Sequence, residues 1–158
     1  MSERDLAARV RAAIADLPTD TGGLAVVLAT SGRPPAMAML SSGDVHIAGD
    51  LLRVGIHASS SAVARLGGAF TLLVPLGEIA ARVEVTNATA IPYPPLAILE
   101  GEVSSIRPTA EPPWVLEMGF RPEPDDHPAI PAYLEYWSEV DEWLSGKRPS
   151  PPIPPGLG

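Results

Sequence analysis

The chain has 158 residues, 46% of them hydrophobic, which is the size and apolar content of a single globular domain. Its formal net charge of −8 at pH 7 argues against a nucleic-acid or anionic-membrane partner, although a local pocket can still hold a small anion. The lack of cysteine in the sequence excludes disulfides, thiolate metal sites, iron–sulfur clusters and cysteine nucleophiles.

Residues 3–17 predict a short amphipathic helix. Apolar residues recur along one of its faces at spacings of three and four: Leu6, Val10, Ile14 and Leu17. Ser2 and Asp5 form a weak capping box, and Pro18 closes the segment. The segment lacks the continuous apolar core of a secretory signal, and no apolar run in the chain reaches the ~20 residues of a membrane span. We therefore expect a soluble cytoplasmic protein.

Residues 22–108 have the pattern of antiparallel β-structure. Short apolar runs alternate with turns that contain glycine, serine or aspartate, as in a meander of hairpins. We expect strands in these runs: 23–32, 35–43, 44–50, 51–58, 69–75, 78–91 and 96–108. Along 51–58, the even-numbered apolar residues share one face, whereas Arg53 and His57 lie on the other.

Two features interrupt the regular meander. The segment 60–68 reads "SSAVARLGG", which has a serine cap, good helix formers and terminal glycines, so a short helix is expected there. The run 78–91 is longer than the usual five or six residues of a strand, which predicts strong curvature or a bulge. Alternation gives this run two faces, one of Ile79, Ala81, Val83, Val85 and Asn87 and the other of Ala80, Arg82, Glu84, Thr86 and Ala88.

Beyond Arg107 the composition changes, because most of the prolines and all three tryptophans lie there. Residues 111–133 are too rich in proline for regular elements, and we expect them to wrap over the barrel or a partner. Residues 132–146 predict a helix that ends before Gly146. Its expected buried face contains Leu134, Trp137, Val140, Asp141 and Leu144. We interpret residues 1–148 as one domain, with a barrel at 22–108 and a C-terminal part at 109–146. Residues 149–158 are then an extended or disordered polyproline-like tail.

About six curved antiparallel strands, a short helix inserted midway and helices at both ends predict a mainly β fold, a small β-barrel with flanking helices. Two stretches carry a resemblance to a known family: "LATSGRPPAMAML" at 28–40 and "RVGIHASSSAVARL" at 53–66. In this order they resemble the antiparallel split β-barrel of the FMN-binding proteins related to pyridoxamine 5′-phosphate oxidase. The resemblance covers roughly Leu24 to Arg107.

The resemblance implies a homodimer that holds FMN in clefts between its subunits, with the phosphate at the start of the inserted helix. Matched position by position, the family's serine falls on Ser60. The family's basic residues fall on neutral ones here: the Arg-Lys pair on Ser61 and Ala62, and the arginine and lysine of the second strand on Met37 and Ser42. We therefore do not expect pyridoxamine phosphate oxidation itself.

The candidate cofactor-binding residues are His57, Ser59, Ser60, Ser61 and Arg65. Serine hydroxyls would donate to a phosphate, Arg65 would add a charge-assisted contact, and His57 would lie beside a flavin ring. The simpler interpretation is that the serines form a helix N-cap and a polar turn. The expected function is an FMN-dependent oxidoreductase of unknown substrate, in which the cofactor supplies the chemistry. No catalytic residue is assigned.

Several alternatives stay open. A flavin-free binding or structural protein of the same fold is one, and a haem-binding member is another, because His46 and His57 lie on neighbouring strands. Without a third ligand we expect no metal site. The "DDH" of residues 125–127 is typical of a solvated turn, and a hydrolase triad has no motif support. Trp114, Trp137 and Trp143 are expected to make packing and dimer contacts.

Overall fold

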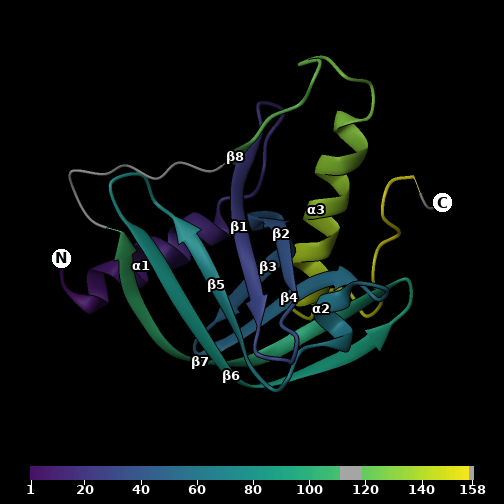
Figure 1. The fold of residues 1–158 in the computed structure, drawn as a ribbon. Coiled ribbons are helices and arrows are strands. Elements are labelled where there is room, and N and C mark those ends of the chain that lie inside the picture. The colour runs from purple at the N-terminus through teal and green to yellow at the C-terminus, as the bar shows by residue number, and fades with distance from the viewer. Residues whose placement is uncertain (111–118, 157–158) are drawn as a thin grey trace.

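One strongly curved sheet dominates the computed structural model, which describes residues 1–110 and 119–156 (Figure 1). In these residues the sheet has eight antiparallel strands: β1 (Gly23–Thr30), β2 (Met37–Ser41), β3 (Val45–Ala48), β4 (Leu51–His57), β5 (Phe70–Pro75), β6 (Ala80–Tyr93), β7 (Leu96–Ala110) and β8 (Gly119–Phe120). The expected mainly β fold, a split β-barrel with flanking helices, is confirmed.

The strand order is β2-β1-β5-β6-β7-β4-β3, and β8 pairs with β1. The two end strands, β2 and β3, follow each other in the chain through one turn of 3-10 helix, η1 (Ser42–Asp44). Ser41 caps this turn, and Asp44 closes a reciprocal capping box with it. The "SSGD" turn expected from the sequence is thus a capped turn between the two edges of the sheet.

The long strand β6 is bulged, as its length predicts. Its register against β7 shifts at three places, the last between Thr86 and Thr89. Asn87 has a left-handed backbone with φ of 51°, which reverses the alternation of the residues beyond it. Ala88 is therefore buried and Asn87 exposed. The predicted face of Ile79, Ala81, Val83 and Val85 is buried, but Asn87 does not share it, because a strict two-residue period ignores the bulge.

Helix α1 (Glu3–Ala15) belongs to the core inside the curved sheet. Ser2 caps it by accepting from the Asp5 amide, as the sequence predicts. The helix buries three of its four predicted stripe residues, Leu6, Val10 and Ile14, and ends before Leu17, because the chain turns extended at Asp16. These residues join the barrel interior, the cluster that also contains Leu28, Leu52, Val54, Phe70, Leu72 and Val83.

Helix α3 (Ile130–Leu144) packs on the opposite face of the sheet. Along β7, Leu99 belongs to the barrel interior, whereas Leu96 and Ile98 contact α3. The cluster on that side, here called the α3 layer, consists of Leu96, Ile98, Val140, Trp143 and Leu144. Gly146 ends the helix with φ of 83°, as expected. Trp143 is buried although the sequence pattern left it off the apolar face, whereas Leu134 and Trp137 are only half-buried.

Two corrections concern the C-terminal third. The prediction that residues 111–133 form no regular element is wrong at Gly119–Phe120, where β8 pairs with the start of β1, and at residues 130–133, which belong to α3. Residues 111–118, which include Trp114, lie outside the described residues. The last described residues have no regular secondary structure, as expected, but Pro152 and Pro154 are buried. This C-terminal segment runs back beside α3 (Figure 1). None of the helices in the described residues has the length and apolar character that a membrane crossing needs.

Candidate functional site

The short helix α2 (Ser61–Ala64) follows β4 through a tight polar turn, here called the serine turn (residues 58–61). Ser60 is the N-cap: its hydroxyl oxygen accepts from the Ala62 amide at 3.2 Å, and its carbonyl accepts from the Val63 amide. The Ser60 amide in turn donates to the His57 carbonyl. The predicted N-cap is confirmed. Three amides at this helix start, those of Ser60, Ala62 and Val63, are bonded within the turn.

The side chains that the turn leaves exposed are those of Ser59, Ser61 and Arg65. A one-turn helix has a small dipole, so hydroxyl donors and the guanidinium group are the features that attract an anion here. They come from one short segment, residues 59–65, and they lie at the end of β4 that His57 occupies.

The loop between β1 and β2 is fastened to this segment. The Ser31 hydroxyl donates to the Gly67 carbonyl at 3.0 Å. A Cβ at Gly32 would lie 2.0 Å from the Arg65 carbonyl oxygen, so only glycine fits there. This contact brings Arg33, the next residue, to the same edge of the molecule as Arg65. Within residues 1–110 and 119–156, neither of these exposed arginines forms an ion pair.

A cavity of about 370 Å³ opens next to the serine turn, between β2, β4, α3 and the C-terminal segment. This volume lies within the ordinary range of small-molecule sites. The side chains that matter for its chemistry are Met39, Asp44, His57, Tyr133, Tyr136 and Trp137. We call it the Asp44 cavity. Its wall on the C-terminal side is Pro154, Pro155 and Gly156.

His57 connects the two features. Its side chain lines the Asp44 cavity, while its carbonyl accepts from Ser60 in the serine turn. A molecule with an anionic end and a planar end can therefore contact both. Among the predicted site residues, His57, Ser59, Ser61 and Arg65 lie at one edge of the barrel. The hydroxyl oxygen of Ser60 accepts a hydrogen bond as the N-cap of α2.

Asp44 is the titratable group of this cavity whose environment is most unusual. Its Oδ2 accepts from the Ser41 amide at 2.9 Å. Burial raises the pKa of Asp44 to about 6, although hydrogen bonds from the Ser41 amide and the Trp137 side chain lower it. A carboxyl group that titrates near neutrality in a cavity is typical of functional sites.

Tyr136 lies close enough to sense this charge. Burial first, and then the negative charge of Asp44, raises the pKa of the Tyr136 phenol far above its ordinary value. The phenol is therefore neutral at physiological pH, and its hydroxyl remains a hydrogen-bond donor.

A second cavity, of about 420 Å³, lies on the other side of Tyr133 and Trp137, which line both. Phe120 of β8 adds a third ring, with its centroid 5.3 Å from that of Trp137, and Tyr133 is 5.8 Å from Trp137. Trp137 is thus a shared wall rather than a residue of the hydrophobic core.

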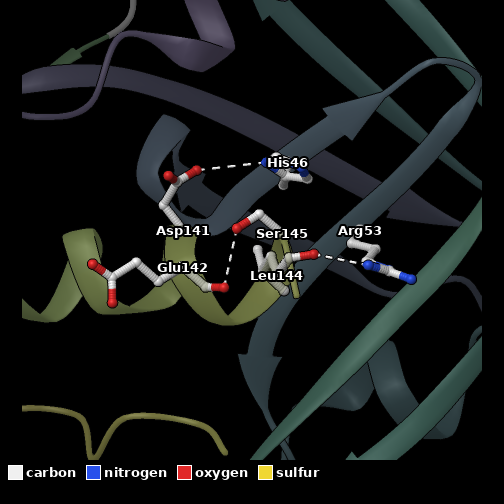
Figure 2. A network of polar contacts seen from close by, with 6 residues as sticks. All are labelled: His46, Arg53, Asp141, Glu142, Leu144 and Ser145. Atoms are coloured by element: carbon white, nitrogen blue, oxygen red, sulfur yellow. Dashed lines mark hydrogen bonds and ion pairs between the residues drawn. The ribbon is translucent and has the colours of Figure 1, made fainter. Parts of the chain in front are cut away.

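The two histidines that suggested a metal or haem site are not brought together. His46 pairs with Arg53 across the β3–β4 hairpin, and His57 lies four residues further along β4, roughly 13 Å away. His46 instead faces α3, where its Nδ1 is 3.5 Å from the Asp141 carboxylate (Figure 2). In the described parts of the chain, no three His, Cys, Asp or Glu residues are grouped so that they could hold a metal ion.

Figure 2 shows how the end of α3 is fastened to the sheet. The Arg53 guanidinium donates to the Leu144 carbonyl at 2.9 Å, and its Nε is 2.7 Å from Glu100. Leu144 is the last residue of α3, so Arg53 binds a carbonyl that no helical amide reaches. Arg53 is therefore a structural residue.

The "DDH" segment is a turn before α3, as predicted. His127 Nδ1 accepts from the Ala129 amide at 3.0 Å, and the His127 amide donates to the Pro124 carbonyl. Asp125 and Asp126 are exposed. This cluster starts the helix and is solvated.

Sequence reasoning missed Asp44, Tyr136 and Trp137. Asp44 was visible only as part of a turn signal, and the S-x-x-D capping pattern at residues 41–44 was its one local indication. Tyr136 and Trp137 come from a helix about ninety residues away in the chain, and only packing places them beside Asp44.

No family model and no curated protein matches the chain. Among solved structures it is similar to the NADH:FAD oxidoreductase SgcE6 of Streptomyces globisporus C-1027, with a TM-score of 0.47 and 13% identity over 64% of this chain and 81% of that one. It is also similar to a candidate oxidoreductase of Sinorhizobium meliloti 1021, with a TM-score of 0.46 and 15% identity over 64% of this chain. The chain spans only 46% of that second protein. At this level of similarity, function has to be inferred from the chain's own residues.

Proposed function

We propose that the chain binds FMN and is an oxidoreductase of the pyridoxamine 5′-phosphate oxidase-like group. The phosphate would lie at the serine turn, and the ring would lie at the mouth of the Asp44 cavity. One observation carries this proposal: His57 both lines the cavity and accepts a hydrogen bond from the serine turn, so the phosphate donors and the cavity are adjacent.

The residues at the ring end fit a planar heterocycle. Met39 and the rings of Tyr133 and Trp137 offer apolar and aromatic surface, and His57 offers a polar edge at the entrance. The cavity volume of about 370 Å³ is within the range of ligand sites.

The residues at the phosphate end also fit, although by other means than in the oxidases that the sequence resembles. Ser59 and Ser61 supply hydroxyl donors, and Arg65 supplies the charge. Arg33 joins them through the Gly32–Arg65 contact. Exposed guanidinium groups without an ion-pair partner in the described residues are ready to bind an anion, so this pair can replace the family's lysine and strand arginine.

Bound FMN supplies hydride and electron transfer, and the chain supplies position and electrostatics. Arg65 and the serines would hold the phosphate, while His57 and Met39 would orient the ring.

We also propose a homodimer, in which β2 contributes to the interface. This strand is one end of the strand order, and its Met37 and Met39 are 71% and 67% exposed. Apolar side chains on an edge strand favour association with another surface. Sedimentation at micromolar concentration should show a dimer, and a monomer alone would contradict this part of the proposal.

The test is the flavin affinity of purified protein. We expect a yellow protein, or a colourless one that binds added FMN and gains thermal stability from it. Arg65→Ala should weaken FMN binding by roughly 10- to 150-fold, because one charge-assisted hydrogen bond contributes about 1.5–3 kcal/mol. Its melting temperature without ligand should not change.

Arg107→Ala is the matched control, because this exposed arginine lies at the end of β7 opposite Leu96, the residue that pairs with His57. It should bind FMN like the parent. A colourless protein that neither binds FMN nor is stabilised by it would favour the alternative, a flavin-free binding or structural protein of the same fold. A Soret band would favour haem.

A further inference from the structure

The inner end of the Asp44 cavity contains a carboxylate without a basic partner. Within the described residues, no lysine or arginine nitrogen lies within 4 Å of Asp44. The side chains that line the cavity include no lysine or arginine either. The hydrogen bond that Asp44 accepts from the Ser41 amide holds the carboxylate in place but leaves its negative charge uncompensated. A positively charged ligand would compensate the negative charge of Asp44.

Aromatic side chains surround the same space. Tyr133, Tyr136 and Trp137 all come from α3 and line the cavity, and the first and last of them are in ring contact at 5.8 Å. Tyr136 is close enough to Asp44 to feel its charge. Aromatic rings attract organic cations, and sites for quaternary amines commonly combine several rings with a carboxylate.

The remaining groups exclude other ligand classes. An anion would be repelled by Asp44, and a neutral apolar compound would leave the carboxylate desolvated and unpaired. The net charge of −8 further favours the approach of a cation. The other titratable residues that line the cavity are His57, Tyr133 and Tyr136, and none of these is a carboxylate.

We propose that the inner end of the Asp44 cavity binds an organic cation, namely a protonated or quaternary amine attached to an apolar group. As the class of the substrate, this inference rests on the proposed function; as a binding property, it does not require flavin. Asp44 pairs with the ammonium group, and the rings of Tyr136 and Trp137 cover its carbon atoms.

The experiment measures the affinity of benzyltrimethylammonium at pH 7.5 by calorimetry, with benzyl alcohol as the neutral probe, on flavin-free protein. The parent should bind the cation at least tenfold more tightly than the alcohol. Asp44→Asn should lose at least tenfold of the cation affinity, because its amide keeps the acceptor for Ser41 but carries no charge. Asp50→Asn, which removes an equal charge from an 86% exposed side chain, should match the parent within twofold.

Three results would overturn the inference: equal affinity for both probes, no loss in Asp44→Asn, or the same loss in Asp50→Asn. If Asp44→Asn does not fold, the pH dependence of the parent decides. Cation affinity should fall about tenfold per pH unit below 6, because Asp44 becomes protonated. A flat profile would contradict the inference.

The same variants separate this inference from the proposed function. A protein that binds the cation but no FMN contradicts only the flavin assignment. A protein that binds FMN but not the cation contradicts only the site proposed here.

Discussion

The two sides of the curved sheet differ in how they are built. The barrel interior is one continuous apolar cluster to which α1 and most strands contribute. Thr30, Ser41 and Ser42 are the most deeply buried polar residues of the described chain, whereas Asp44 is half-buried. The α3 layer has five fully buried residues, and its helix is also held by polar contacts from Arg53 and His46. Both cavities border α3.

This difference links the stability of the fold to the barrel interior and ligand binding to the α3 layer. Continuous apolar packing stabilises the barrel, because each buried side chain there has neighbours on all sides. The α3 layer leaves space beside polar and aromatic groups, which is what a ligand site requires. Equivalent substitutions in the barrel interior and in the α3 layer should therefore have different effects.

The largest effect is expected from a large-to-small substitution in the barrel interior. Leu72 and Leu144 are both fully buried, one in each layer. Leu72→Ala should lower the free energy of unfolding by about 2–5 kcal/mol, and every probe should report it, because the barrel unfolds as a unit. Leu144→Ala should instead release α3 first.

Two probes distinguish these outcomes during urea denaturation. Tryptophan fluorescence reports mainly the α3 layer, because Trp137 and Trp143 lie in this helix, and hydrogen exchange of β5 and β6 amides reports the barrel. We expect coincident shifts for Leu72→Ala and separate transitions for Leu144→Ala. Coincident transitions in both variants would show that the two layers form one cooperative unit.

The second prediction concerns charge. The pKa of Asp44 is about 6 in the folded protein and near 3.8 in the unfolded chain, so between these values the folded state holds the proton more tightly. Stability conferred by the protonated carboxyl is therefore lost as pH rises from about 4 to 6. Relative to Asp44→Asn, the parent should lose roughly 2–3 kcal/mol of unfolding free energy between pH 4 and 7.

Urea denaturation at a series of pH values measures this difference. The carboxyl group of Glu78, which pairs with Arg9 of α1, behaves in the opposite way to that of Asp44. A backbone hydrogen bond, and then Arg9, hold the pKa of Glu78 below its usual range. A parent whose stability relative to Asp44→Asn does not change with pH would show that Asp44 is solvated, and a parent that gains stability as pH rises would show that Asp44 is paired with a cation.

The smallest effect is expected from an added methyl group under α3. A Cβ at Gly43 would lie 2.8 Å from Trp137 Cδ1 and 2.9 Å from its Cβ, so the helix has to move. Gly43→Ala should cost about 1–2 kcal/mol and weaken cation binding, because Trp137 lines the Asp44 cavity. Gly55→Ala is the comparison for stability alone, because Gly55 also lines the cavity and its nearest neighbour, Val140 Cγ1, is 3.3 Å away. Equal losses of unfolding free energy in the two variants would contradict this ranking.

Local sequence patterns were sufficient for most of the fold. The two-residue period placed Leu52, Val54 and Ile56 inward, and the serine–glycine signals placed the Ser60 cap and the end of α3 at Gly146. These features depend on neighbours within about five residues. The period failed at Asn87, where a left-handed residue reverses the alternation and has no reliable local signal.

The sequence by itself determined the mainly β architecture, the capped turns, the amphipathic α1 and the hydroxyl and arginine groups after β4. Only the tertiary structure decided which groups meet: it placed Asp44 beside Tyr136 and Trp137, separated His46 from His57, and committed Arg53 to the end of α3. The physical reason is the distance along the chain over which each interaction acts. Strand alternation and capping act over a few residues, whereas the burial that raises the pKa of Asp44 depends on a helix about ninety residues further along the chain.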